Sequence, residues 1–363
     1  MIKRILKMTF IGLLSLIVLF VLIVFRLFAI KIYDSQVQIR HMKNLEEMYQ
    51  SNYEPIDESS FVDFDRFDNL TTLDEIQMLA SHNSYKKKGS SLGKLFVGLG
   101  DSFSEARALK YGYKNLTDQF EAGIRSMEFD VRKRKSSFVL THVPLVDNSS
   151  VAPDFSDALE EIYLYSSNNP THIPMIFLVE VKTDWMILDH ALQDIDEKEL
   201  EELNDLIKDK LKDRLYTPKD MIEEGLTLSE TIDQNGWPTV TSLLGKVIFV
   251  LHPGEMNEPY FNLDTTLKSQ SMFIGSYESN LTFDYTSFVV HNAVDSLRIQ
   301  QLVSDGYIVR TRIDENLIFD EERFLEAISS GAQILTSDFT HGRNDLKASD
   351  MITLQNYTVR KRI

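Results

Sequence analysis

The first part of the chain is strongly apolar. Residues 8–25 are almost all hydrophobic, and the basic residues Lys3, Arg4 and Lys7 precede them. At about 1.5 Å per residue this run reaches roughly 30 Å, which is enough for a helix to cross a bilayer. Large residues crowd its end, whereas a cleaved signal peptide would show small residues there. We therefore predict an uncleaved transmembrane anchor over residues 1–31.

The anchor is followed by a segment of different character. Apolar residues recur at helical spacing over residues 32–50, which predicts that the anchor continues as a helix. Residues 51–69 are acidic and contain one proline, as is typical of a linker. We interpret residues 32–71 as a stalk that separates the anchor from the rest of the chain.

From residue 72 onward, short strand-like apolar runs alternate with helical patterns. Such alternation is typical of parallel strand–helix–strand units. The predicted strands cover residues 77–81, 125–131, 138–142, 175–182, 246–252, 287–291, 307–313 and 333–338. The clearest predicted helices cover residues 154–167, 186–215, 294–304 and 321–330.

Eight strands with intervening helices favour a closed α/β barrel over an open sheet. The roughly 290 residues that follow the anchor and stalk suit a single (β/α)8 TIM barrel, which needs about 250 residues plus insertions. We place this barrel at residues 72–345 and a C-terminal tail at residues 346–363. The connection between the second and third predicted strands, residues 132–137, is short, so we expect the barrel to be irregular there.

Composition and charge exclude several classes of chemistry and binding partner. The chain has no cysteine, which excludes disulfides, thiolate metal sites and a cysteine nucleophile. Its formal net charge is −17 although the anchor is basic, so the body is acidic and does not suit nucleic-acid binding. The basic residues before the anchor predict a cytoplasmic N-terminus and an extracytoplasmic body.

Candidate chemical groups stand at the ends of the predicted strands, where barrels of this type carry their active sites. Glu128 and Asp130 are two residues apart, so in a strand they share one face. Neighbouring carboxylates repel each other, which suits a cation between them. The other candidates at strand ends are His82, Asn83, His142, Glu180, Lys182, Arg310, Arg312 and Asp338.

Most candidates also have a structural alternative. Glu128 and Asp130 could be solvated acids of an edge strand. His82 could belong to a helix-capping turn, and His142 could be a core imidazole. The charged candidates could instead form structural ion pairs. Lys182 would pair with Glu180, and Arg310 or Arg312 would pair with Asp338 or Asp314. These alternatives are open on the sequence alone.

The order of the candidate residues resembles a known family. The motifs that carry the resemblance are His82-Asn83-Ser84-Tyr85, Asp-Gln-Phe-Glu-Ala-Gly-Ile-Arg at 118–125, Glu128-Phe129-Asp130, His142, Glu180-Val181-Lys182, and residues 309–314, 330–333 and 336–338. Together they resemble the calcium-dependent phosphoinositide-specific phospholipase C family of bacteria and fungi, which has a PLC-like phosphodiesterase barrel. The resemblance covers residues 72–343, and residues 86–113 and 255–284 depart from it.

The resemblance implies a role for each matched residue. The calcium ligands would be Asn83, Glu128, Asp130 and Glu180, and the catalytic pair would be His82 and His142. The residues implied at the substrate phosphate or headgroup are Lys182, Arg310, Arg312 and Asp338. Calcium prefers such oxygen ligands, magnesium is also possible, and zinc would prefer more imidazole.

We expect a metal-dependent phosphodiesterase that acts on phosphatidylinositol or a related glycerophospholipid. Attack by a headgroup hydroxyl would give a cyclic phosphate and a diacylglycerol-type alcohol. In this scheme His142 is the general acid, His82 stabilises the phosphoryl charge, and Glu128 or Glu180 is the base.

Two other functions compete with this one. A glycerophosphodiester phosphodiesterase would use water, but that family typically shows His-Arg-Gly where this chain has His-Asn-Ser. An inactive barrel could serve as a surface binding module, although neither histidine is missing. In every case the expected partners are a phospholipid or glycerophosphodiester and the membrane, with no nucleic acid.

Overall fold

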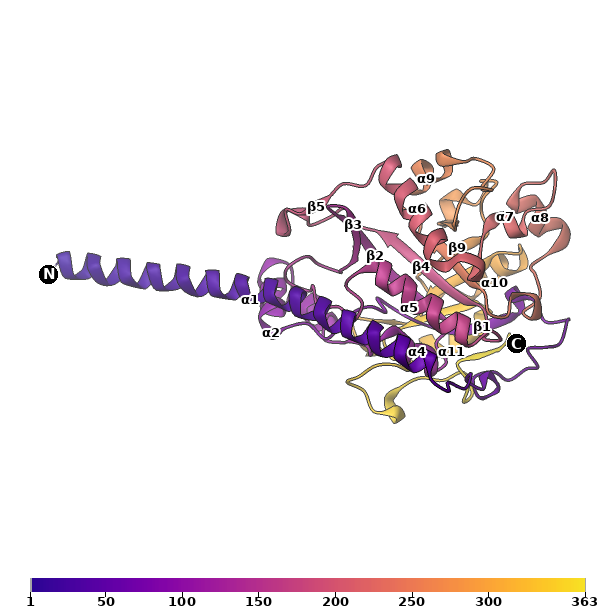
Figure 1. Ribbon diagram of the computed structural model, residues 1–363, viewed down its shortest axis with the longest axis horizontal. Helices are drawn as coiled ribbons and strands as arrows, with labels where there is room; N and C mark the ends of the chain where they lie inside the picture. The colour runs from indigo at the N-terminus through magenta and orange to yellow at the C-terminus, as the bar shows by residue number, and fades with distance from the viewer. Residues whose placement is uncertain (1, 363) are drawn as a thin grey trace.

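Strands lie in the interior of the body with helices outside them (Figure 1), and the pairing of the parallel strands closes into a ring. The computed structural model describes residues 2–362, and within them eight strands form this ring in the order β1-β13-β10-β9-β8-β7-β4-β2. Pairing of Ala80 in β1 with Ser126 in β2 closes it. The ring strands are β1 (Ile76–Ser81), β2 (Ser126–Arg134), β4 (Met175–Val181), β7 (Val247–Leu251), β8 (Met272–Ser276), β9 (Phe288–Val290), β10 (Ile308–Arg312) and β13 (Ile334–Ser337). The predicted (β/α)8 barrel is confirmed.

Two strand assignments differ from the prediction. The predicted third strand is β3 (Ser137–Leu140), which pairs antiparallel with β2 outside the ring. Only residues 135 and 136 join the two strands, and so short a connection can make a hairpin but no parallel crossover. The ring strand that was not predicted is β8, which lies in the region 255–284. The shorter strands are β5 (Leu192–Gln193), β6 (Leu215–Tyr216), β11 (Asp314–Glu315), β12 (Ile318–Phe319) and β14 (Val359–Lys361).

Helices cover the outside of the ring. Three predicted helices match α5 (Phe155–Asn168), α10 (Ser296–Ser304) and α11 (Glu321–Ser330) within two residues at each end. The fourth, α6 (Glu197–Leu211), starts later than predicted because Asp196 and Glu199 form a capping box that fixes its first turn. The remaining helices are α2 (Ser91–Gly100), α3 (Phe103–Ala108), α4 (Leu116–Glu121), α7 (Pro218–Met221), α8 (Leu228–Asn235) and α9 (Asn257–Leu263).

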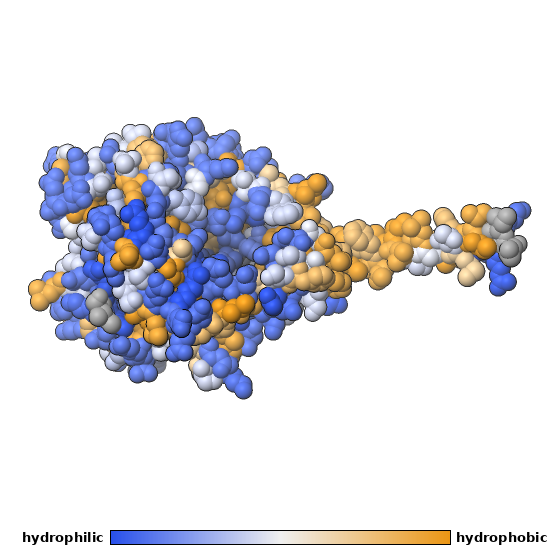
Figure 2. Space-filling view, turned by 180° about the vertical axis from the view of Figure 1, so that it is seen from behind, coloured by the Kyte–Doolittle hydropathy of each residue, from blue (hydrophilic) through white to orange (hydrophobic). Residues whose placement is uncertain are grey.

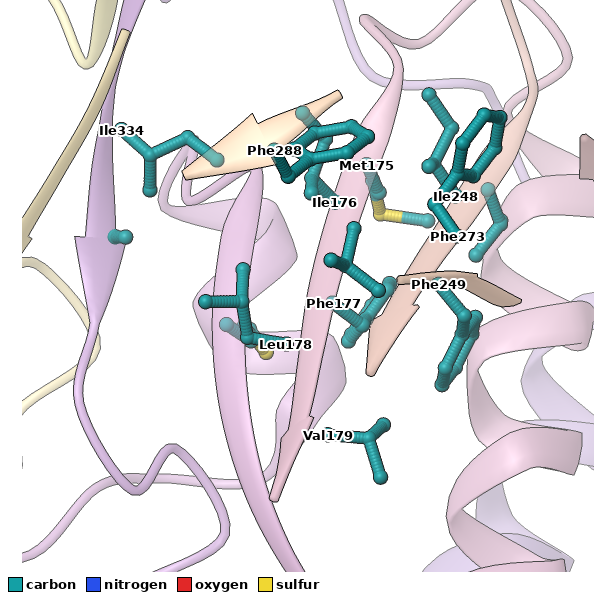
Figure 3. Close-up of a cluster of buried hydrophobic side chains, with 14 of the residues drawn as sticks. Met175, Ile176, Phe177, Leu178, Val179, Ile248, Phe249, Phe273, Phe288 and Ile334 are labelled. Atoms are coloured by element: carbon teal, nitrogen blue, oxygen red, sulfur yellow. The ribbon is translucent and has the colours of Figure 1, made fainter. Parts of the chain in front are cut away.

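The core has two parts, because successive side chains of a ring strand point inward and outward. On the outer face, the rings of Phe177 and Phe249 stack with centroids 5.0 Å apart beneath the helices. Figure 3 shows these rings among the buried side chains of β4 and its neighbours. On the inner face, Glu128 of β2 lies beside Leu178 of β4 in the strand register. The polar candidates therefore point into the barrel.

A single long helix, α1 (Ile2–Gln50), runs along the body and extends well beyond it (Figure 1). Large apolar side chains between Ile5 and Phe25 are exposed, whereas Leu27, Met42 and Leu45 are buried against the body. The polar contacts that dock its second half are Asn148 to the Leu27 carbonyl, Lys31–Asp189, Lys87–Asp34, Gln38 with the backbone of Asp154, and His41–Glu161. The predicted continuation of the N-terminal helix over residues 32–50 is confirmed.

The segments before and after the predicted barrel pack against the end of the ring where its strands begin. Glu58 forms a fully buried ion pair with Arg125 at the base of β2. The final strand β14 pairs antiparallel with β1. Gly123 has a φ of +86°, and a Cβ there would come within 2.5 Å of Phe61 and Thr358, so only glycine fits this approach. The domain limits at residues 71 and 345 remain predictions.

Candidate active site

The turn after β1 is fastened to β2. Asn83 has a φ of +47°, a left-handed conformation that asparagine tolerates. The Ser84 backbone N–H donates to the Glu128 carbonyl at 2.9 Å, and the Ser84 hydroxyl accepts from the Glu128 N–H at 3.0 Å. Tyr85 donates to the Asp130 carboxylate at 3.0 Å. The His-Asn-Ser-Tyr motif therefore places His82 and Asn83 beside the two acids of β2.

The acids of β2 lie in different electrostatic surroundings. Arg310 donates to both oxygens of Glu128, at 2.6 and 2.8 Å, and Thr336 donates at 2.8 Å. Burial opposes ionisation of Glu128, but the charge of Arg310 holds its pKa below the usual range. Burial raises the pKa of Asp130, and the neighbouring charge of Glu180 adds to this effect. Glu128 thus has a counter-charge in direct contact, whereas the charges around Asp130 have both signs: Lys182 and His142 favour its ionised form and Glu180 opposes it.

The donor set fits a calcium ion only in part. Across residues 2–362, no three His, Asp or Glu side chains converge closely enough to hold a metal ion. Glu128 forms an ion pair with Arg310, and Glu180 forms an ion pair with Lys182 at 2.6 Å. Neither carboxylate is therefore free to point into a shared metal site. Asp130 lies directly across from Glu180 in the strand register, and their repulsion is of the kind that a cation relieves. Asn83, Asp130 and Glu180 suit the ion, while Glu128 would first have to leave Arg310.

His82 belongs to a charged network at the end of β13. Its Nδ1 lies 3.0 Å from Asp338 and 3.0 Å from the hydroxyl of Tyr111. Arg312 donates to Asp338 at 3.0 Å and lies 3.3 Å from Nε2 of His82. Burial opposes ionisation of Asp338, but His82 and Arg312 lower its pKa. The ion-pair alternative for Arg312 is therefore observed, and Asp338, which we expected at the substrate phosphate or headgroup, contacts His82.

His142 follows β3 and has a carboxylate of its own. Its Nδ1 lies 3.2 Å from Asp147, and Asp147 also pairs with the fully buried Lys86, 3.0 Å away. Arg132 donates to the backbone carbonyl of His142 at 2.8 Å. Burial would raise the pKa of Asp147, but Lys86 and His142 hold it low. Sequence reasoning missed Asp147, Lys86 and Tyr111, and the only signal was a basic residue directly after the His-Asn-Ser-Tyr motif.

The candidate residues divide between two cavities and the barrel interior. A polar cavity of about 280 Å³ is lined by His82, Asn83, His142, Arg312 and Asp338. Glu180 and Lys182 line a second cavity of about 280 Å³ together with His252, which sequence analysis left without a role. Three candidates line neither cavity and are buried in the barrel interior: Glu128, Asp130 and Arg310. Both histidines thus face one chamber.

Comparison with known proteins points to one family. The family described as phosphoinositide phospholipase C, Ca²⁺-dependent, matches residues 71–137 and 132–362. A calcium-dependent phosphoinositol-specific phospholipase C from a Pseudomonas species is 17% identical with a TM-score of 0.60, and the match covers 84% of this chain and 100% of that one. A Ca²⁺-dependent phosphatidylinositol-specific phospholipase C from Streptomyces antibioticus is 18% identical with a TM-score of 0.54, covering 74% and 95%. At these identities the solved structures show a shared fold. No curated protein matches this chain.

Proposed function

Because this chain belongs to the calcium-dependent phosphoinositide phospholipase C family, we propose that it cleaves the phosphodiester of phosphatidylinositol or a related glycerophospholipid. The observation that carries the proposal is the chamber in which His82 and His142 meet, each held by its own aspartate. A phosphodiester seated there has a proton donor on one side and a positive cluster on the other.

We assign the chemical roles from these surroundings. A headgroup hydroxyl attacks phosphorus, which forms a cyclic phosphate and releases the glycerol oxygen. His142, oriented by Asp147, gives a proton to that leaving oxygen, and His82 with Arg312 stabilises the phosphoryl charge. A carboxylate accepts the proton of the attacking hydroxyl. Because Arg310 lowers the pKa of Glu128, Glu180 is the better candidate for this base.

Calcium is the metal that the family implies, and Mg²⁺ would suit the same kind of oxygen ligand. In this chain Asn83, Asp130 and Glu180 would hold it, with Glu128 added once Arg310 releases it. Bound there, the ion would supply positive charge that lowers the pKa of a nearby hydroxyl. Lys182, now paired with Glu180, would then be free for the substrate phosphate.

The first test uses phosphorus NMR on the full-length protein with phosphatidylinositol, glycerophosphoinositol and glycerophosphocholine. We expect a cyclic phosphate from the inositol substrates, loss of turnover on chelation, and recovery with Ca²⁺. Asp130→Asn should weaken that recovery, because it removes one of the hard oxygen charges. An open monoester would instead indicate a water-using glycerophosphodiesterase, and no turnover of any substrate would indicate a binding module.

We also propose that α1 anchors the protein as a single-pass membrane helix with a cytoplasmic N-terminus. Its apolar residues are exposed on all sides over the part that extends beyond the body, and basic residues lie at its start. We expect the chain to fractionate with membranes and the body to be cut by protease added outside intact cells. A soluble product that begins near Lys31 would show a cleaved signal instead.

A further inference from the structure

An apolar groove lies where α1 leaves the body. Its volume is about 340 Å³, and its walls include Phe20, Val24 and Leu27 of α1 and Phe96 and Gly100 of α2. The Phe20 and Phe96 rings meet edge to face, with centroids 6.3 Å apart. Figure 2 shows hydrophobic side chains gathered at this junction. The groove is therefore built partly from the helix that we propose to enter the membrane.

The groove joins the polar chamber at a catalytic residue. Glu105, Leu109 and His142 line both cavities. On one side of His142 lie His82 and Arg312, and on the other side lie the apolar walls of α1 and α2. An amphiphilic molecule with a phosphate at His142 would thus have a polar chamber for its head and an apolar groove for its tail.

Exposed apolar side chains lie on the elements around this groove. Leu95 and Leu99 of α2, Phe103 of α3, and Trp185 and Ile187 in the turn after β4 are between 48% and 77% exposed. Trp185 also lines the groove. Apolar surface gathered in this way typically marks contact with a membrane or a partner. Its position beside the apolar half of α1 favours the membrane.

We propose that the groove holds the glycerol end and the adjoining acyl chain of a membrane phospholipid, which enters sideways from the bilayer between α1 and α2. This inference rests on the proposed function and adds the binding site for the lipid tail. The headgroup hydroxyl forms the new O–P bond as the glycerol O–P bond breaks. The proton from His142 goes to the glycerol oxygen, so the released alcohol remains in the groove that opens to the bilayer.

Gly100 allows the groove to be filled without strain. A Cβ there meets no atom within 4 Å, and its φ lies outside the left-handed region. Gly100→Phe should therefore occupy the groove and leave the body intact. The matched control is Leu325→Phe, because Leu325 of α11 is 55% exposed and lines neither the groove nor the polar chamber.

The experiment compares kcat/KM for long-chain phosphatidylinositol in vesicles and for glycerophosphoinositol, which has no acyl chain. Gly100→Phe should lose about tenfold or more on the lipid and stay within about twofold of wild type on the soluble ester, because overpacking excludes only the tail. Leu325→Phe should stay within about twofold on both. Equal behaviour of the two variants on the lipid would overturn the proposal.

A second readout separates this inference from the proposed function. Native mass spectrometry of the full-length protein from mild detergent should find a phospholipid retained by wild type and Leu325→Phe but lost from Gly100→Phe. If wild type cleaves neither substrate, the proposed function fails, yet this difference in retention would still support the groove. Equal retention by all three proteins would refute the groove whatever the activity shows.

Discussion

Replacing His142 with alanine should slow cleavage of an alkyl phosphodiester by about 10²- to 10⁴-fold, because the leaving alcohol then lacks its proton donor. A nitrophenyl diester with the same headgroup needs little protonation, so we expect it to lose much less. The measurement is single-turnover kinetics with both substrates in the presence of Ca²⁺. Equal loss for both would refute the acid role of His142.

His82→Ala should behave differently because His82 faces the phosphoryl group, whatever the leaving alcohol. Its loss should cost about 2–4 kcal/mol of transition-state stabilisation with both substrates. His190, which is exposed, provides the control, and His190→Ala should leave both rates unchanged. If the nitrophenyl substrate were spared in His82→Ala instead, the two histidines would have exchanged roles.

Arg310→Met should destabilise the calcium-free protein by about 3–5 kcal/mol, because Glu128 is left buried without its counter-charge. Added Ca²⁺ should restore part of this loss, since the freed carboxylate can join the ligands and binding favours the folded state. The measurement is thermal or urea unfolding with EDTA and with Ca²⁺.

The control for this prediction is a more exposed ion pair. Arg298 pairs with Glu278 nearer the surface, so Arg298→Met should cost only about 0–1 kcal/mol. Combining Arg310→Met with Glu128→Leu should recover most of the loss, because a buried ion pair can be replaced by apolar side chains. An Arg310→Met protein as stable as wild type in EDTA would contradict the geometry of the pair.

The barrel could be predicted because its strands and helices differ in hydrophobic period, but two local features were misread. The apolar run 138–140 resembles a ring strand, and only the two-residue connection reveals the β2–β3 hairpin. β8 is a run of five residues that ends in Gly275 and Ser276, and it lies between segments without a helical pattern. The closed ring sets the length and the pairing partner of each strand. A short stretch of sequence does not encode these long-range pairings.

The site could be predicted where its residues belong to strands. Glu128 and Asp130 share a face because strand geometry requires it, and the Ser84 contacts follow from the same motif. The aspartate beside each histidine could not be predicted in this way. Asp147 lies in a loop after His142, and Asp338 reaches His82 from the far end of the chain. Such partners depend on tertiary contacts that periodicity does not encode.

The pairing of β1 has a consequence for how the chain is made. This strand is synthesised first among those of the ring, yet two of its neighbours, β13 and β14, follow every other strand of the described residues in chain order. During synthesis one edge of β1 therefore stays open, and open edges are templates for wrong pairing. Contacts between distant parts of a chain also form slowly. Synthesis of β13 is thus the event that allows the ring to close against β1, and a chain that lacks β14 would keep its catalytic residues but leave the first half of β1 without that partner.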